Sequence, residues 1–180
     1  MEDTTYIVTL VARAKAGSKE ALGELYDAFI SRIYRFVYFR VGKREDAEDV
    51  TEQVFLKVYG HIGEYEERGL PLEAWIFRIA RNQITDFYRT RRDTEVPLEE
   101  AVEVADSHPT PEEETERVLE YEQVLRAIKK LPEQYQEIII LKFIEERDTN
   151  EISILLEKPE SHVRVLQSRA LAKLREVLGI

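Results

Sequence analysis

The 180-residue chain contains no cysteine and no apolar run long enough to cross a membrane. The absence of cysteine excludes disulfides and thiolate metal sites. No secretory signal pattern is recognisable either, so we expect a soluble cytoplasmic protein without membrane insertion. His61 has no neighbouring ligand residues at metal-binding spacing. We therefore expect neither a metal ion nor another cofactor.

Motifs for catalysis are also missing from the sequence. It has no glycine-rich phosphate loop, no HExxH motif and no nucleophile motif, and its carboxylate pairs follow the surfaces of expected helices. We therefore do not expect an enzyme. The length fits one domain or two small domains, each with a modest core.

Negative charge is concentrated in one part of the chain. The net charge is −10, which by itself argues against a nucleic-acid partner. Ten of the 36 acidic residues lie within residues 93–116, which contain no lysine or arginine. The rest of the chain carries 26 acidic and 26 basic residues and is neutral overall, so DNA binding outside the acidic segment is not excluded.

Apolar residues recur at helical spacing through most of the chain. They predict a helix over residues 6–16, a second that follows Ser18 as its N-cap and stops at Gly42, and a third over 44–59, with Gly17 at the end of the first. A fourth helix is predicted over residues 72–92, with an aromatic and aliphatic stripe on one face and arginines beside the other. Periodicity alone leaves open whether those arginines contact phosphate or only solvent.

Two segments carry a resemblance to a known family. Residues 74–92 read A-W-I-F-R-I-A-R-N-x-x-x-D-x-x-R-x-R-R, and residues 46–58 read D-A-E-D-V-T-E-Q-V-F-L-K-V. The first resembles the promoter-melting helix of bacterial extracytoplasmic function (ECF) sigma factors. The second resembles the segment of the same family that docks on the RNA polymerase clamp. The two segments stand in the family order.

The resemblance implies roles for particular residues of the N-terminal half. For polymerase docking, the implied residues are Asp46, Glu48, Asp49, Glu52 and Gln53, although many members have glutamine before glutamate where this chain reads Glu52-Gln53. The implied contacts to the −10 promoter element are Tyr65, Arg68, Arg78, Arg81, Asn82 and Arg89. For two of these residues a structural role stays open. Tyr65 could instead pack its glycine-rich loop, and Asn82 could instead brace the fold with Asp86.

The acidic segment has the composition of a flexible linker, with Pro97, Pro109 and Pro111 among its acids. About 24 extended residues reach roughly 80 Å. A promoter spacer of about 17 base pairs, at about 3.4 Å per pair, measures roughly 60 Å. One chain could therefore contact two separated promoter elements.

The C-terminal part predicts a helix-turn-helix. Helices are expected over residues 117–131 and 133–144, followed by a capped short helix from Asp148, a turn at 157–160 and a final helix over 161–178. Together with Leu131-Pro132-Glu133 and Arg169-Ala170, this resembles the −35-reading domain of the same family. The implied contacts to the −35 element are Ser161, His162, Arg164, Val165, Ser168 and Arg169.

This helix-turn-helix departs from the family pattern at several positions. Glu157 replaces the usual turn glycine, His162 replaces a threonine, and Val165-Leu166 replace serine-arginine. The recognition surface is therefore less basic than is typical for the family. We expect an unusual sequence preference.

The sequence thus predicts an all-α protein of two small helical domains joined by an acidic linker. The expected boundaries are 1–93 for sigma region 2, 94–116 for the linker and 117–180 for sigma region 4. The expected function is an ECF-type sigma factor whose partners are promoter DNA, the clamp and flap regions of core RNA polymerase, and potentially an anti-sigma factor. The alternative is a stand-alone helix-turn-helix regulator with an N-terminal dimerisation or sensing domain.

Overall fold

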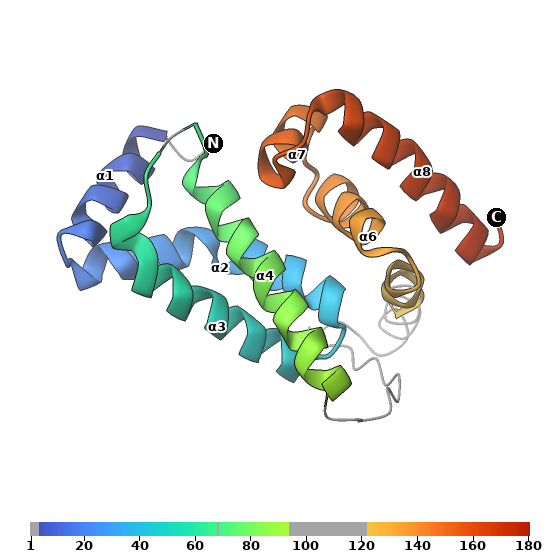
Figure 1. The fold of residues 1–180 in the computed structure, drawn as a ribbon, viewed down its shortest axis with the longest axis horizontal. Coiled ribbons are helices and arrows are strands. Elements are labelled where there is room, and N and C mark those ends of the chain that lie inside the picture. Colours follow the sequence, from blue (N-terminus) through green and yellow to red (C-terminus); the bar gives the residue numbers. More distant parts are fainter. Residues whose placement is uncertain (1–3, 68, 94–121) are drawn as a thin grey trace, which may run out of the picture.

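The computed structural model describes residues 4–67, 69–93 and 122–180, and this part of the chain contains no β-strand. The N-terminal half contains α1 (Thr4–Lys15), α2 (Lys19–Val41), α3 (Arg44–His61), the short 3-10 helix η1 (Ile62–Glu64) and α4 (Leu72–Asp93). The C-terminal half has a helix over residues 122–129, then α6 (Glu133–Ile139), η2 (Ile140–Ile144), α7 (Thr149–Leu156) and α8 (Glu160–Leu178). Figure 1 shows the arrangement. The expected all-α class is confirmed.

Local signals set the ends of the N-terminal helices. Ser18 caps α2 by accepting a hydrogen bond from the backbone N–H of Ala21 at 3.2 Å. Gly42 ends α2 with a φ of 84°, a left-handed conformation that glycine adopts without steric cost. Helix α3 starts two residues later, so α2 and α3 pack against each other as neighbours.

The core of the N-terminal half is built from the predicted apolar stripes. Phe36 of α2 and Phe77 of α4 are buried and meet edge to face, with ring centroids 5.1 Å apart. Val54 of α3 and Ile84 of α4 are fully buried in the same cluster. Helix α4 is therefore fixed by its apolar stripe, which leaves its arginine side at the surface.

The C-terminal half contains the predicted helix-turn-helix, with one irregularity. The expected single helix over 133–144 changes at Ile140 from α-helical to π-helical geometry. Helix α7 begins with a capping box, in which Asp148 accepts from the N–H of Glu151 and the Glu151 carboxylate accepts from the N–H of Asp148. Helices α7 and α8 then pack together across the turn at 157–159.

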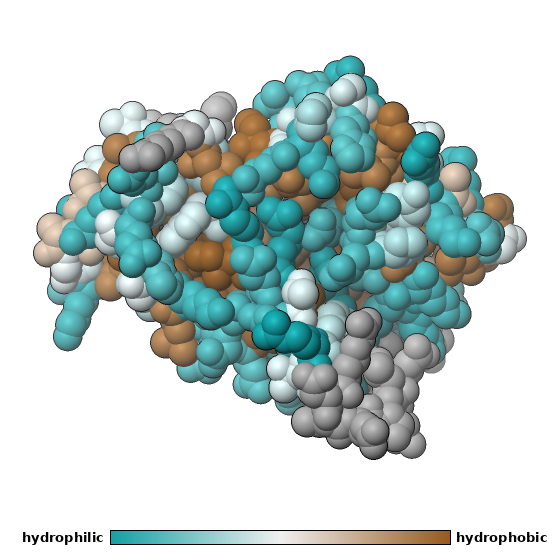
Figure 2. All heavy atoms as spheres, viewed as in Figure 1, coloured by the Kyte–Doolittle hydropathy of each residue, from teal (hydrophilic) through white to brown (hydrophobic). Residues whose placement is uncertain are grey.

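The two halves lie side by side. Helix α4 packs against α7, and α2 packs against η2. Buried residues of both halves belong to one continuous apolar cluster. The face drawn in Figure 2 is mostly hydrophilic, with hydrophobic side chains gathered in the gaps between helices. The predicted linker, residues 94–116, lies outside the described residues.

Candidate polymerase and nucleic-acid interfaces

The outer face of α3 presents four of the five predicted docking residues to solvent. Glu48, Asp49, Glu52 and Gln53 are exposed, because their neighbours at helical spacing turn inward. Those inward residues include Val50 and Val54 of the same helix. The fold thus produces a polar, largely acidic surface on α3.

Asp46, the fifth predicted docking residue, has a different environment. Its carboxylate is only 24% exposed and accepts a hydrogen bond from Nη1 of Arg91 at 2.7 Å. This ion pair joins the start of α3 to the end of α4. In this conformation Asp46 stabilises the contact between two helices.

Two of the predicted −10 contacts, Arg78 and Arg81, meet a carboxylate from the other half. Arg78 binds Glu157 in a two-pronged contact, with Nε to Oε1 at 2.8 Å and Nη2 to Oε2 at 2.6 Å. Arg81 lies 3.5 Å from the same carboxylate and donates to the carbonyl of Leu155 at 3.4 Å. The site can therefore hold an anionic oxygen group between two arginines of one helix.

The other predicted −10 residues lie in separate places. Asn82 and Arg89 are exposed on α4, and Arg89 pairs with Asp86 one turn earlier at 3.0 Å. Asp86 also lies 3.9 Å from Lys57 of α3. Arg68 lies outside the described residues. The structure thus gathers Arg78 and Arg81 into one site and places Arg89 near the far end of α4.

Tyr65 is packed into the protein. It is 6% exposed, its ring lies 5.2 Å from that of Trp75, and its hydroxyl donates to the carbonyl of Leu70 at 2.9 Å. Burial, with a contribution from the Glu67 carboxylate, raises the pKa of Tyr65 to about 12. These contacts favour the packing role that the sequence left open, because a buried ring offers no face to a flipped base.

All six predicted −35 residues share the outer face of α8. Ser161, His162, Arg164, Val165, Ser168 and Arg169 are exposed. Val163, Leu166 and Ala170 are buried between them and fix the helix on the domain. Leu166 therefore belongs to the core, whereas its neighbour Val165 is 46% exposed and free to meet a base methyl group.

Arg164 is held by a network that the sequence did not indicate. Its Nη2 donates to Oε2 of Glu160 at 2.7 Å, and the other oxygen of Glu160 accepts from the Asn150 side chain at 3.2 Å. The network links α7, through Asn150, to the first turn of α8. It orients the guanidinium along the outer face of the helix.

Two family models match this chain, one in each half. The sequence model of Sigma-70 region 2 matches residues 25–94, and that of Sigma-70, region 4, matches residues 121–174. The ECF RNA polymerase sigma factor BldN of Streptomyces coelicolor is 33% identical over 177 residues, covering 98% of this chain and 67% of that protein. This chain belongs to the ECF sigma factors.

Another ECF sigma factor is similar in sequence, and two solved structures are similar in fold. SigW of Bacillus subtilis is 26% identical over 177 residues, covering 93% of this chain and 94% of that protein. The structure of CnrH in complex with the cytosolic domain of CnrY matches with a TM-score of 0.69 and 24% identity, covering 95% of this chain and 96% of that one. The sigma factor RpoE of Bartonella quintana, solved with the anti-sigma factor NepR, matches with a TM-score of 0.66 and 21% identity, covering 88% and 96%.

The function follows from membership of this family. This chain binds core RNA polymerase and directs promoter-specific initiation of transcription. Sigma factors as a class are non-enzymatic initiation factors. The alternative of a stand-alone regulator is not favoured, because region 2 is present beside region 4. None of the helices in the described parts of the chain is long and apolar enough to cross a membrane.

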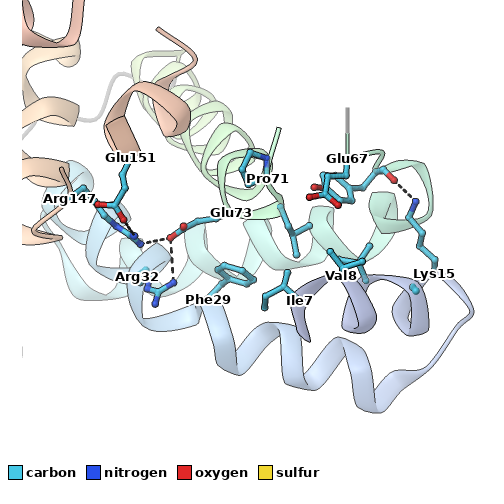
Figure 3. Close-up of a pocket in the computed structure, with 14 residues that line it drawn as sticks. Ile7, Val8, Lys15, Phe29, Arg32, Glu67, Pro71, Glu73, Arg147 and Glu151 are labelled. Atoms are coloured by element: carbon cyan, nitrogen blue, oxygen red, sulfur yellow. Dashed lines mark hydrogen bonds and ion pairs between the residues drawn. The ribbon is translucent and has the colours of Figure 1, made fainter. Parts of the chain in front are cut away.

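A pocket of about 690 Å³ lies where α1, α2 and the start of α4 meet the C-terminal half. Figure 3 shows apolar side chains, among them Ile7 and Phe29, along its middle. Charged groups stand at both ends: Lys15 donates to the carbonyl of Tyr65 at one, and Arg147 meets Glu73 at the other. No sequence pattern predicted this pocket, because its walls come from segments that are distant in the chain.

Proposed function

We propose that three helix faces of the ECF sigma factor bind three different targets. The acidic outer face of α3 docks on the polymerase clamp, the arginine side of α4 holds the unpaired strand of the −10 element, and the outer face of α8 reads the −35 element. The observation that carries this proposal is the alternation along α8, where the six candidate residues are exposed and the residues between them are buried. A helix fixed in this way presents one continuous row of side chains to a groove.

Two sets of variants, compared in two assays, test the roles of α3 and α4 independently. Replacing Arg78 and Arg81 together with alanine removes two of the three arginines of α4 that are assigned to DNA, the two that share one site. Permanganate footprinting of the transcription bubble should then show a loss of melting, while pull-down of core polymerase is retained. Replacing Glu48 and Glu52 with alanine should give the reverse, because these residues are exposed on α3 and no contact joins them to Arg78 or Arg81 among the described residues.

A matched control comes from an exposed arginine outside the three faces. Arg126, which pairs with Glu122 within one helix, is 49% exposed, and Arg126→Ala should leave both assays unchanged. Equal loss in both assays after the α4 substitutions would contradict the assignment. Run-off transcription from promoter fragments, with and without the sigma factor, tests the overall role.

We extend the proposal to an anti-sigma partner and to the cytoplasm, where core polymerase works. RpoE of Bartonella quintana was solved with the anti-sigma factor NepR. The pocket between α1, α2 and α4 gives such a partner an apolar site beside both halves. Co-expression with a candidate partner should abolish run-off transcription, and substitution of the exposed Val8 with lysine should restore it.

A further inference from the structure

A row of arginine–carboxylate pairs joins the two halves. Arg35 of α2 binds Glu145 with two hydrogen bonds, at 2.7 and 3.0 Å. Arg40 of the same helix binds Glu133 at 2.7 Å and Glu137 at 3.2 Å. Arg78 and Arg81 of α4 likewise meet Glu157 of the C-terminal half. In all these pairs the arginine comes from the N-terminal half and the carboxylate from the C-terminal half.

One contact has the opposite polarity. Arg147 of the C-terminal half binds Glu73 of α4, and Glu73 also lies 3.4 Å from Arg32 of α2. Arg147 is further paired with Glu151, 2.9 Å away. Most of the pairs nevertheless have the arginine in the N-terminal half, because four arginines of that half contact carboxylates of the other half.

We propose that these pairs latch the free sigma factor in a closed form, with the Glu157 carboxylate in the place that a DNA phosphate takes between Arg78 and Arg81. A carboxylate and a phosphate present the same kind of oxygen pair to a guanidinium group. Bound nucleic acid and the closed form therefore exclude each other at this site. The inference rests on the proposed function, since that function assigns the arginine side of α4 to DNA.

In the closed form the two DNA-binding faces are too close together to reach both promoter elements. Glu157 contacts Arg78 directly, and only residues 158–160 separate it from Ser161 at the start of the −35-reading face, a span of at most about 15 Å. The two promoter elements lie roughly 60 Å apart along the duplex, with about 3.4 Å per base pair. The halves must therefore separate before both elements are bound.

The ion pairs between the halves stabilise the closed form only weakly, because some of the buried arginine nitrogens in them have no hydrogen-bond partner among the described residues. Arg40 is 2% exposed, and the Nε atoms of Arg40 and Arg81 are buried without a hydrogen-bond partner among the described residues. Desolvation offsets most of the attraction in a buried ion pair. Salt or a competing polyanion then shifts the balance toward the open form, which exposes the arginines to water or phosphate.

The absence of cysteine allows a direct test by distance measurement. Spin labels at Lys19→Cys and Ala172→Cys, both exposed, report the separation of the two halves in the full chain. We expect one narrow distance distribution at low salt and a broad, longer one in Glu145→Arg, which places a cation against Arg35. Adding Arg35→Glu should restore the narrow distribution by reversing the pair.

Glu176→Arg is the matched control, since it makes the same change in charge on the C-terminal half and its partner is Lys173 of the same helix. It should keep the narrow distribution. If Glu145→Arg fails to fold by circular dichroism, Arg35→Glu alone supplies the opening variant, because Arg35 is 51% exposed. An unchanged distribution in the opening variant, or no restoration in the double variant, overturns the latch.

A second measurement separates failure of the latch from failure of the proposed function. Fluorescence anisotropy with a mixed-sequence single-stranded DNA should show tighter binding by Glu145→Arg than by the parent, on the order of fivefold. Neither residue of the reversed pair belongs to the assigned DNA faces. If the spin-label distance increases in Glu145→Arg but DNA binding is no tighter, the latch is supported and the DNA role of α4 is contradicted. If the distance and the DNA affinity both equal those of the parent, only the latch is overturned.

Discussion

Glu157 links the stability of the helix-turn-helix to the contact between the halves, and its replacement separates the two effects. The residue has a φ of 54°, a left-handed conformation that costs an L-residue other than glycine roughly 1 to 2 kcal/mol. Its backbone N–H closes α7 on the carbonyl of Ile154. Glu157→Gly keeps this turn, removes the strain and also removes the ion pair with Arg78.

The structure indicates which is larger, the backbone strain at Glu157 or the stabilisation from its ion pair with Arg78. The side chains of Arg78 and Glu157 are 44% and 38% exposed, so solvent screens the pair, and its loss costs about 0.2 to 1 kcal/mol. Relief of strain is at least as large, which predicts that Glu157→Gly is as stable as the parent or up to about 2 kcal/mol more stable. For a chain of this size 1 kcal/mol corresponds to about 2 to 4 °C in Tm.

Glu157→Ala is the matched control, because alanine loses the carboxylate but keeps the Cβ that makes the left-handed conformation unfavourable. Thermal unfolding followed by circular dichroism should place glycine about 1 kcal/mol above alanine, with the parent between them or close to the glycine variant. If Glu157→Gly and Glu157→Ala have the same Tm, the argument from backbone strain is refuted.

Three further predictions concern the scaffold of the interfaces. Phe77→Ala should destabilise the chain by about 3 to 5 kcal/mol in a denaturant titration, since the side chain is 1% exposed and packs on Phe36. Asp148→Ala should cost about 1 kcal/mol through loss of the α7 cap, with Asp148→Asn largely retaining it. Tyr65→Phe should remove part of the loss of stability between about pH 10 and about pH 12: the folded pKa is raised to about 12, so the protonated phenol stabilises the fold below pH 10 and loses this effect as pH rises. The difference between parent and variant is the quantity to measure, because burial also raises the pKa of Tyr88.

The sequence predicted those features of the fold that depend on nearby residues. Ser18 and Gly42 marked helix ends through their backbone preferences, and Asp148 marked the start of α7 through its cap. The outer face of α8 was predictable for the same reason, since the spacing of Val163 and Ala170 determines which residues face solvent. Each of these signals lies within one or two helical turns.

The remaining features depend on residues that are distant in sequence. Arg40 and Glu137 are separated by 97 positions, and no periodicity connects them. Helical spacing also gave no indication that Tyr65 would be buried against Trp75, because Tyr65 lies in a loop. The π-helical segment from Ile140 was equally unmarked, since its apolar residues suit an ordinary α-helix as well.

Arg78 and Glu157 are partners in the closed form, yet their removal should affect DNA binding in opposite directions. Arg78 serves both states, because it binds the carboxylate when the halves are closed and, in the proposed function, phosphate when they are open. Glu157 serves only the closed state, so its loss frees the arginines without removing a DNA contact. An interface mutant can therefore look neutral in a stability assay and still change promoter engagement, which is why the two residues must be compared by binding as well as by melting.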